Sequence, residues 1–313
     1  MKVYLVSPEQ NSYKANMHCH STLSDGKLTP EQLKKAYRER GYQILAFTDH
    51  NRLIDHADLD EPGFITLPSY EVNADQRPGA GDWSYQKTHH LNIYFEHPER
   101  FDPALLAERK CTYEIESINR FICEINQSGG LVCYNHPDWS LQEINTYGRI
   151  QGLFAMEIFN FGCEVGEFNG NSQYQYDKML RAGQKIFCLA GDDNHNAFPF
   201  TDGKNDSFGG FTVIQAPNLS RASVFRALRT GRFYSSTGPA IYQCYVEDGK
   251  IRIEAPGMYK VFVLTRGRRS YSKLSDTPFD QAEFAFLPQD GYLRVVCFND
   301  KNQFAATNAY WLS

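Results

Sequence analysis

The sequence predicts an α/β fold with a largely parallel sheet, followed by a small antiparallel β unit. Strand-like and helix-like segments alternate through the first two-thirds of the chain, which is typical of parallel α/β architectures. After about Pro239 the pattern changes to short alternating runs broken by EDG, PG and QDG, which are hairpin signals. The chain has 313 residues, of which 42% are hydrophobic and 22% charged, enough for one large core and a smaller one.

The elements follow in order from capping and periodicity. Residues 29–41 form the first expected helix, with Thr29 as N-cap, Pro30 at the first helical position, Gln32 completing a capping box and Gly41 as the stop. A buried strand is expected directly afterwards at 43–50. The later alternation predicts strands at 64–71, 89–95, 131–137, 153–160 and 186–191, and helices at 113–130, 173–183 and 220–231. We therefore expect two domains, residues 1–239 and residues 240–313.

Charge and composition limit the partners and the compartment that the sequence predicts. The net charge of −5 and the pI near 6.0 argue against a surface that wraps nucleic acid, so we expect no nucleic-acid partner. No apolar run is long enough for a membrane span or a signal peptide, so we expect no membrane association. The eight cysteines are scattered without a CxxC pair, which favours buried free thiols and a cytoplasmic protein.

The stretch MHCHSTLSDG contains the first candidate metal ligands. Residues two apart in a strand point to the same face, so His18 and His20 can bind one ion while Cys19 faces the other side. Asp25 follows five residues later and can bind the same ion or a neighbouring one. An isolated HxH pair is weak evidence, because most such pairs are accidents of surface sequence.

Ligand-type side chains also stand at the ends of the other expected strands. In α/β barrels the chemistry collects at the carboxyl ends of the strands, so we expect these side chains to meet. They are His50, Glu71, His136, Asp193 and His195.

His90 opens its expected strand instead of closing it. It reaches the same mouth if strand 89–95 runs antiparallel to strand 64–71, with residues 72–88 lying over the site as a lid. His89 is the alternative ligand, because adjacent strand residues face opposite sides and only one of the two can point at the metals.

These motifs resemble those of a known family. HCHSTLSDG, FTDHN, YEVN, HHLNIYF, YNHPD and AGDDNH are similar, in order and spacing, to the motif set of the PHP (polymerase and histidinol phosphatase) superfamily. The stretch SVFRALRTGRFYSSTGPAI resembles a segment of its CehA/McbA-type branch, and the whole resemblance covers roughly residues 14–245.

The resemblance implies a distorted seven-stranded, TIM-like (β/α) barrel in residues 1–239 that holds two or three divalent metal ions. By the same resemblance, the first ion would take His18, His20, Glu71 and Asp193. The second would share Glu71 and take His90 and His136, and the third would take Asp25, His50 and His195. Asp192 departs from the family pattern, and we expect it to point away from the ions into a supporting hydrogen bond.

Mixed imidazole and carboxylate ligands suit zinc, manganese or iron(II). We expect a metal-dependent hydrolase, with a phosphoesterase acting on a small-molecule ester through a metal-bridging hydroxide as the preferred function. Its catalytic residues would be Glu71, Asp193, His195 and Asp25. The alternatives are a carboxylic or carbamic ester hydrolase and a non-catalytic metal-dependent binding module. Cations that could clamp a phosphate are few in the sequence near these motifs: Arg52, Arg77, Lys87 and Lys204.

Overall fold

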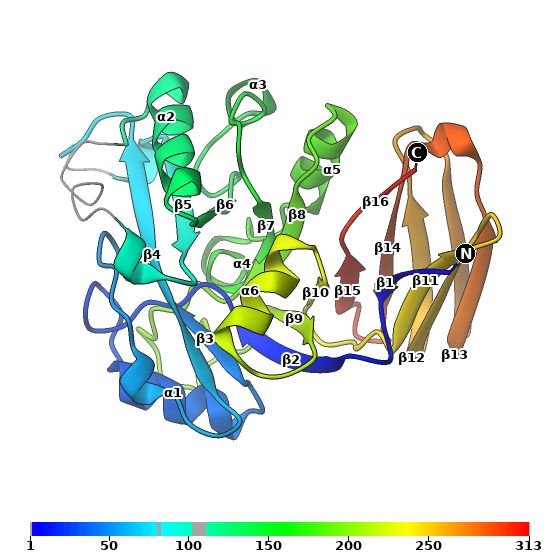
Figure 1. The fold of residues 1–313 in the computed structure, drawn as a ribbon, viewed down its shortest axis with the longest axis horizontal. Coiled ribbons are helices and arrows are strands. Elements are labelled where there is room, and N and C mark those ends of the chain that lie inside the picture. The colour runs from blue at the N-terminus through cyan, green and yellow to red at the C-terminus, as the bar shows by residue number, and fades with distance from the viewer. Residues whose placement is uncertain (1, 80–82, 102–110, 313) are drawn as a thin grey trace.

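The structure, a computed structural model, describes residues 2–79, 83–101 and 111–312 (Figure 1). In this part of the chain sixteen strands join into one hydrogen-bonded sheet. One part of the sheet is strongly curved and carries the helices, and the other is a β unit in which both chain ends lie (Figure 1).

The curved part contains seven strands that follow one another in sequence order. The first three are parallel, the fourth is antiparallel to both of its neighbours, and the last three are parallel again. The predicted antiparallel arrangement of the strand that carries His90 is therefore confirmed. The strands are β2 (Asn11–Asn16), β3 (Ile44–Phe47), β4 (Ile65–Asp75), β5 (Thr88–Tyr94), β6 (Leu131–Tyr134), β7 (Ala155–Asn160) and β8 (Phe187–Gly191).

The two ends of this curved part approach each other without a continuous backbone ladder between described residues. Strand β9 (Phe211–Ala216) pairs antiparallel with β2 and lies beside β8. The Thr212 hydroxyl accepts a hydrogen bond from Ala190 N–H and donates to Ala190 O, at 3.1 and 2.9 Å. The predicted α/β fold is confirmed, while its backbone ring stays open at this point and a side chain bridges the gap.

The helices pack beside individual strands of the curved part. Helix α1 begins with the predicted capping box at Thr29 and lies beside β3. Helix α2 lies beside β6, α5 beside β7 and α6 beside β9. Helix α4 was not predicted, and it begins where β7 ends because the Asn160 side chain accepts a hydrogen bond from Cys163 N–H. The helices are α1 (Pro30–Glu39), α2 (Ile115–Gln127), α3 (Ile144–Tyr147), α4 (Phe161–Glu167), α5 (Gln173–Arg181) and α6 (Arg221–Arg229).

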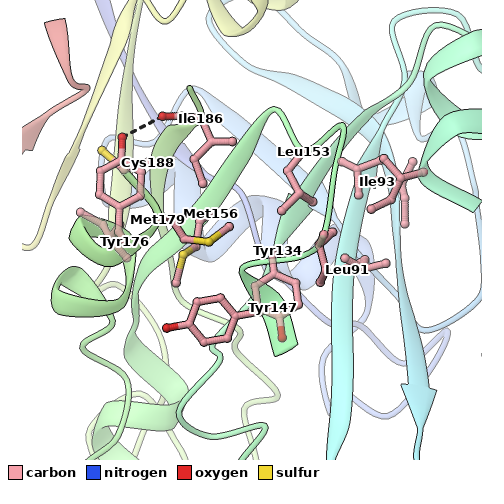
Figure 2. Packing of buried hydrophobic residues seen from close by; sticks show 14 of the residues in the cluster. Leu91, Ile93, Tyr134, Tyr147, Leu153, Met156, Tyr176, Met179, Ile186 and Cys188 are labelled. Carbon is pink, nitrogen blue, oxygen red and sulfur yellow. Dashed lines mark hydrogen bonds between the residues drawn. The ribbon is translucent and has the colours of Figure 1, made fainter. Parts of the chain in front are cut away.

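A large cluster of buried apolar side chains packs the helices against the strands. Ile118, Phe121, Ile122 and Ile125 recur at helical spacing on α2 and are fully buried in it. Figure 2 shows part of this cluster, in which the Tyr176 hydroxyl donates to Ile186 O at 2.9 Å. Burying the phenol with its hydrogen bond satisfied lets the tyrosine contribute apolar area without an unpaired polar group.

The β unit contains strands from both ends of the chain. Its antiparallel hairpins confirm the β character that the sequence predicts after residue 239, and the proposed boundary lies between β10 (Phe233–Ser236) and β11. The sequence did not predict that β1 (Val3–Val6) would pair with β11, with Val3 opposite Val246. The remaining strands are β11 (Gln243–Glu247), β12 (Lys250–Leu264), β13 (Ser270–Ala285), β14 (Tyr292–Phe298), β15 (Phe304–Thr307) and β16 (Tyr310–Trp311).

Buried polar contacts join the β unit to the curved part. Arg294 on β14 is fully buried, and it donates to Asp177 at 3.1 Å and to Gln173 at 2.9 Å on α5. Asn308 accepts a hydrogen bond from Cys188 N–H at 2.8 Å and donates to two carbonyls beside β10. Strand β15 also pairs directly with β10, so the junction combines a backbone ladder with buried side-chain contacts.

All eight cysteines are free thiols and six of them are buried, as the sequence predicted. Within the described ranges, no helix combines the length and the apolarity needed to cross a membrane.

Candidate metal centre

The nine predicted ligands come together where the strands of the curved part end. His18 and His20 follow β2, His50 follows β3 and His136 follows β6. Glu71 is an exception, because β4 continues to Asp75 and the glutamate lies within the strand instead of at its end. The lid expected at 72–88 is accordingly shorter: residues 72–75 and 88 belong to β4 and β5, and only residues 76–87 connect them, of which 80–82 lie outside the described residues.

The HxH pair lies just beyond β2, which ends at Asn16. Cys19 faces away from the histidines, is buried and forms an isolated parallel bridge with Asn194. The two imidazoles converge, with Nε2 of His18 and Nε2 of His20 lying 3.1 and 3.0 Å from Oδ1 of Asp193. The alternation of side chains that the sequence predicts for residues 18–20 therefore continues beyond the hydrogen-bonded part of β2.

Glu71 is the centre of the cluster and is 1% exposed. Its Oε1 accepts a hydrogen bond from Asn135 Nδ2 at 2.8 Å. Five imidazoles surround the two oxygens of this carboxylate at 3.0–3.6 Å: His18, His20, His50, His90 and His136. A single carboxylate with so many basic neighbours suits a bridge between two cations.

His90, and not His89, faces the cluster. Nδ1 of His90 lies 3.0 Å from Oε1 of Glu71. His89 is buried on the other side of β5, where its Nδ1 lies 2.8 Å from the Tyr134 hydroxyl. The period-two alternation of a strand separates the two rings.

The carboxylate of Asp25 lies among three histidines at the outer edge of the cluster. Its oxygens lie 3.4 Å from His195 Nε2, 3.6 Å from His50 Nε2 and 3.6 Å from His20 Nδ1. Asp25 is 51% exposed, whereas Glu71 and Asp193 are covered. The outer group is therefore the part of the cluster that solvent reaches most easily.

Potential ligand atoms fall into overlapping groups that match the sets implied by the resemblance. Three of these groups are His18–His20–Glu71–Asp193, Glu71–His90–His136 and Asp25–His50–His195, the last also including His20. Within each group the ligand atoms lie within 4.8 Å of one another. The residues present therefore fit divalent ions, and their roles as ligands are proposals.

Unpaired polar atoms support this fit. Buried polar atoms are normally hydrogen-bonded, because an unpaired one costs free energy. Several atoms of the cluster are buried without a hydrogen-bond partner in the structure: His18 Nε2, both ring nitrogens of His20, His50 Nδ1, His136 Nε2 and Asp193 Oδ1. Imidazole nitrogens and carboxylate oxygens that converge without hydrogen-bond geometry are the donor set that zinc, manganese and iron(II) prefer.

Charge compensation within the cluster shifts the pKa values of its members. Burial alone would raise the pKa of Asp193, but His18 and His20 outweigh burial and hold that pKa well below 3.8. Burial would lower the pKa of His20, but the carboxylates of Asp193 and Glu71 raise it to about 10. Burial lowers the pKa of His50 to about 4. The carboxylates therefore raise the pKa values of His18 and His20, and these histidines in turn lower the pKa of Asp193.

Glu157, which the sequence analysis missed, supports the cluster from β7. Its Oε1 lies 3.0 Å from Nδ1 of His18, and its Oε2 accepts a hydrogen bond from Asn160 Nδ2 at 2.9 Å. Asn160 Nδ2 also donates to Asp193 at 3.0 Å, so one amide connects two carboxylates. The available signal was a glutamate inside the apolar run LFAMEIFN, since a buried strand rarely carries an unpaired charge.

Asp192 points away from the ligands, as expected from its position. Its carboxylate accepts hydrogen bonds from the Tyr37 hydroxyl at 2.6 Å and from three backbone amides of residues 208–210. Asp193, the next residue, has a left-handed φ of 54°, which a non-glycine residue seldom adopts. The contacts of Asp192 hold the backbone in the conformation that presents Asp193 to the histidines.

A cavity of about 450 Å³ opens above the cluster. Trp139 lines it and contacts the rings of His90 and His136, with centroids 5.5 and 5.1 Å apart. Among the described lining residues none is a lysine or an arginine, so Arg52, Arg77, Lys87 and Lys204 do not form the phosphate clamp that we considered. The other lining residues are Asp25, His50, Glu71, Asn73, Asp75, Ser84, Gln86, Thr88, Leu141, Asp193 and His195.

Comparison with known proteins places this chain in a family. Residues 16–194 match the model of the PHP domain. A 5′-3′ exoribonuclease of Haemophilus influenzae is 28% identical over 109 residues, which are 34% of this chain and 37% of that protein. The chain therefore spans little more than a third of the length of that relative.

One solved structure shares the fold of this chain. A two-domain protein of Bacteroides vulgatus, described as containing a predicted PHP-like metal-dependent phosphoesterase, has a TM-score of 0.51, 14% identity and 96% coverage of both chains. A putative metal-dependent phosphoesterase of Bifidobacterium adolescentis has a TM-score of 0.37 and 15% identity, covering 63% of this chain and 93% of its own. The match over the whole chain shows a shared fold.

Proposed function

Because this chain belongs to the PHP domain family and is a metal-dependent hydrolase, we propose that it hydrolyses phosphoesters of nucleotides or of nucleic-acid strand ends. The observation that carries the proposal is the position of Glu71. It is buried among five imidazoles and lines the cavity, where a phosphoester could reach ions held by the cluster.

The expectation that nucleic acid is not a partner is wrong. It rested on the acidic net charge, whereas the curated relative is named a 5′-3′ exoribonuclease. Net charge is summed over the whole protein surface, but binding the end of an RNA or DNA strand needs only a local site. Ions bound by the cluster would neutralise the one phosphate that enters, so a basic surface is not required.

The residues of this chain would have distinct tasks. Glu71 and Asp193 would hold two ions close together, since each lies near histidines of more than one ligand group. Asp25 and His195 would hold a further ion at the exposed edge, next to the entering substrate. When bound, the ions supply an activated water and stabilise the negative charge that develops on the phosphate. Glu157 would keep the His18 ring in position.

One observation keeps a second candidate open. A cavity whose described lining contains no lysine or arginine also suits a carboxylic or carbamic ester, which carries no phosphate charge. The assignment to the CehA/McbA branch, which motivated this alternative, stays a prediction.

A substrate panel tests the proposal. The full chain would be stripped with a chelator, reloaded separately with zinc, manganese and iron(II), and assayed against p-nitrophenyl phosphate, bis-p-nitrophenyl phosphate, p-nitrophenyl acetate and a short 5′-phosphorylated oligoribonucleotide. We expect metal-dependent release of nitrophenol or nucleotide from the phosphoesters. Hydrolysis of the acetate alone would favour the second candidate and contradict the phosphoesterase.

A further inference from the structure

The cavity has a wall that belongs to none of the ligand groups. Asn73 and Asp75 follow Glu71 at two-residue steps on β4, so the three side chains share one face of the strand. Gln86 lines the cavity from the connection to β5. We call Asn73, Asp75 and Gln86 the polar wall. At about 3.3 Å per residue, the Cα of Asp75 lies about 13 Å along the strand from that of Glu71, which leaves room for a group beyond the phosphate.

The carboxylate of Asp75 is fixed in place but not saturated. Oδ1 accepts a hydrogen bond from the Thr88 hydroxyl, and Oδ2 accepts one from Asn73 Nδ2, each at 2.8 Å. Each oxygen of an ionised carboxylate has two acceptor positions, so each has one left for a ligand. The hydrogen bonds from Thr88 and Asn73 fix the orientation of the Asp75 carboxylate. Its remaining acceptor positions are therefore available to a ligand that enters the cavity.

Gln86 adds a second acceptor. Its Oε1 is buried and has no hydrogen-bond partner in the structure. A buried acceptor without a donor is costly, and a ligand that supplies the donor removes that cost. The acceptors of Asp75 and Gln86 thus call for the same kind of partner, a group with hydroxyl or amino hydrogens.

Charge decides further between possible partners. Asp75 is anionic, and the described cavity lining contains no lysine or arginine that would neutralise it. A second phosphate at this position would be repelled, whereas a hydroxyl would be attracted. Carboxylates bind ribose hydroxyls in dinucleotide-binding folds, and the 2′-hydroxyl is what distinguishes RNA from DNA at a binding site.

We propose that the polar wall is a subsite for the ribose hydroxyls of the nucleotide whose phosphate lies at the metal cluster. The proposal rests on the phosphoesterase function above and narrows its substrates to ribonucleotides and RNA ends.

Three substrates separate the two proposals. Metal-loaded full chain would be assayed with adenosine 5′-monophosphate, its 2′-deoxy analogue and p-nitrophenyl phosphate, which lacks a sugar. We expect kcat/KM for the ribonucleotide to exceed that for the deoxynucleotide about tenfold or more, as a hydrogen bond to a charged acceptor allows. In Asp75→Asn this ratio should fall to about one. Gln86→Leu should also lower the ratio of kcat/KM values. Asp58→Asn, on an exposed part of the surface, serves as the matched control.

Equal kcat/KM values for the two nucleotides in the wild type would overturn the subsite. An unchanged ratio in Asp75→Asn would do so as well, because the discrimination would then lie elsewhere. Equilibrium titration of both nucleotides into zinc-loaded protein gives the same comparison without turnover. If neither nucleotide nor p-nitrophenyl phosphate is hydrolysed but the ribonucleotide still binds more tightly, the phosphoesterase proposal fails and the subsite stands.

Discussion

Oε1 of Glu157 lies 3.0 Å from Nδ1 of His18, while Nε2 of the same ring lies 3.1 Å from Oδ1 of Asp193. The glutamate therefore occupies one edge of the imidazole and leaves the other edge facing the cluster. A carboxylate that accepts from Nδ1–H fixes the tautomer in which Nε2 is free to bind an ion.

Glu157→Gln should weaken metal binding without removing a ligand. Such supporting carboxylates typically contribute about 10–100-fold to metal affinity. Competition with a chromogenic chelator measures the loss, and Glu39→Gln, an exposed change on α1, is the matched control. Equal affinities in Glu157→Gln and the control would mean that Glu157 does not orient His18.

Glu71→Gln should reduce turnover about a hundredfold or more, because it removes the charge that would hold two cations together. The fold should persist, since the side chain keeps its size and Asn135 can reorient its amide. Hydrolysis and bound metal would be measured together, with His97→Gln as control because His97 is exposed and contacts only Glu96 and Glu99 among the interactions described. Near-wild-type rates in Glu71→Gln would show that the cluster is not the active site.

Asp25→Asn should remove one ion per chain and leave the others. Its carboxylate lies near His195, His50 and His20 at the exposed edge, whereas Glu71 and Asp193 lie deeper in the protein. We therefore expect a smaller loss of turnover than in Glu71→Gln. Metal analysis by mass spectrometry of protein purified without chelator decides the point, and an unchanged ion count would contradict the proposed outer site.

Metal affinity should rise with pH. In the metal-free protein the pKa of His20 is raised from 6.5 to about 10, so its ring carries a proton at neutral pH that a metal must displace. The pKa values of Glu71 and Asp193 are lowered, so these carboxylates are already ionised and release no proton. Apparent zinc affinity measured at pH 6, 7 and 8 should increase about tenfold per unit for each proton released. A flat profile would show that the innermost histidines are neutral before metal binds.

Arg294→Met should destabilise the protein strongly if Asp177 is left in place. Both side chains are buried, and removing one partner of a buried ion pair typically costs about 3–5 kcal/mol because the other charge stays unpaired. Denaturant unfolding measures the change, and Arg294→Met combined with Asp177→Leu should recover much of the loss. If the double variant is no more stable than Arg294→Met, the loss of stability does not come from the unpaired charge of Asp177.

The convergence of these side chains was predictable because most of them follow a strand closely or lie on one with a fixed alternation. The same period-two rule separates His90 from His89 and places Cys19 away from the histidine cluster. Sequence could not place the end of β4, since Val72 and Ala74 continue the apolar alternation beyond Glu71 and the first Pro-Gly pair comes only at Pro78 and Gly79. Glu157 was missed because its partner, His18, is distant in sequence and only the fold brings them together. The expectation of no nucleic-acid partner was wrong because net charge says nothing about one local site.

The pairing of Val3 with Val246 has a consequence for how the chain is made. During synthesis β1 leaves the ribosome long before its partner β11, because the whole curved part lies between the two strands in the sequence. The curved part can therefore begin to collapse while β1 waits with an unpaired edge, and such long-range pairings form slowly. The β unit is complete only when β1 and β11 are both present, so a transcript that stops before β11 would yield a chain whose β1 lacks this partner.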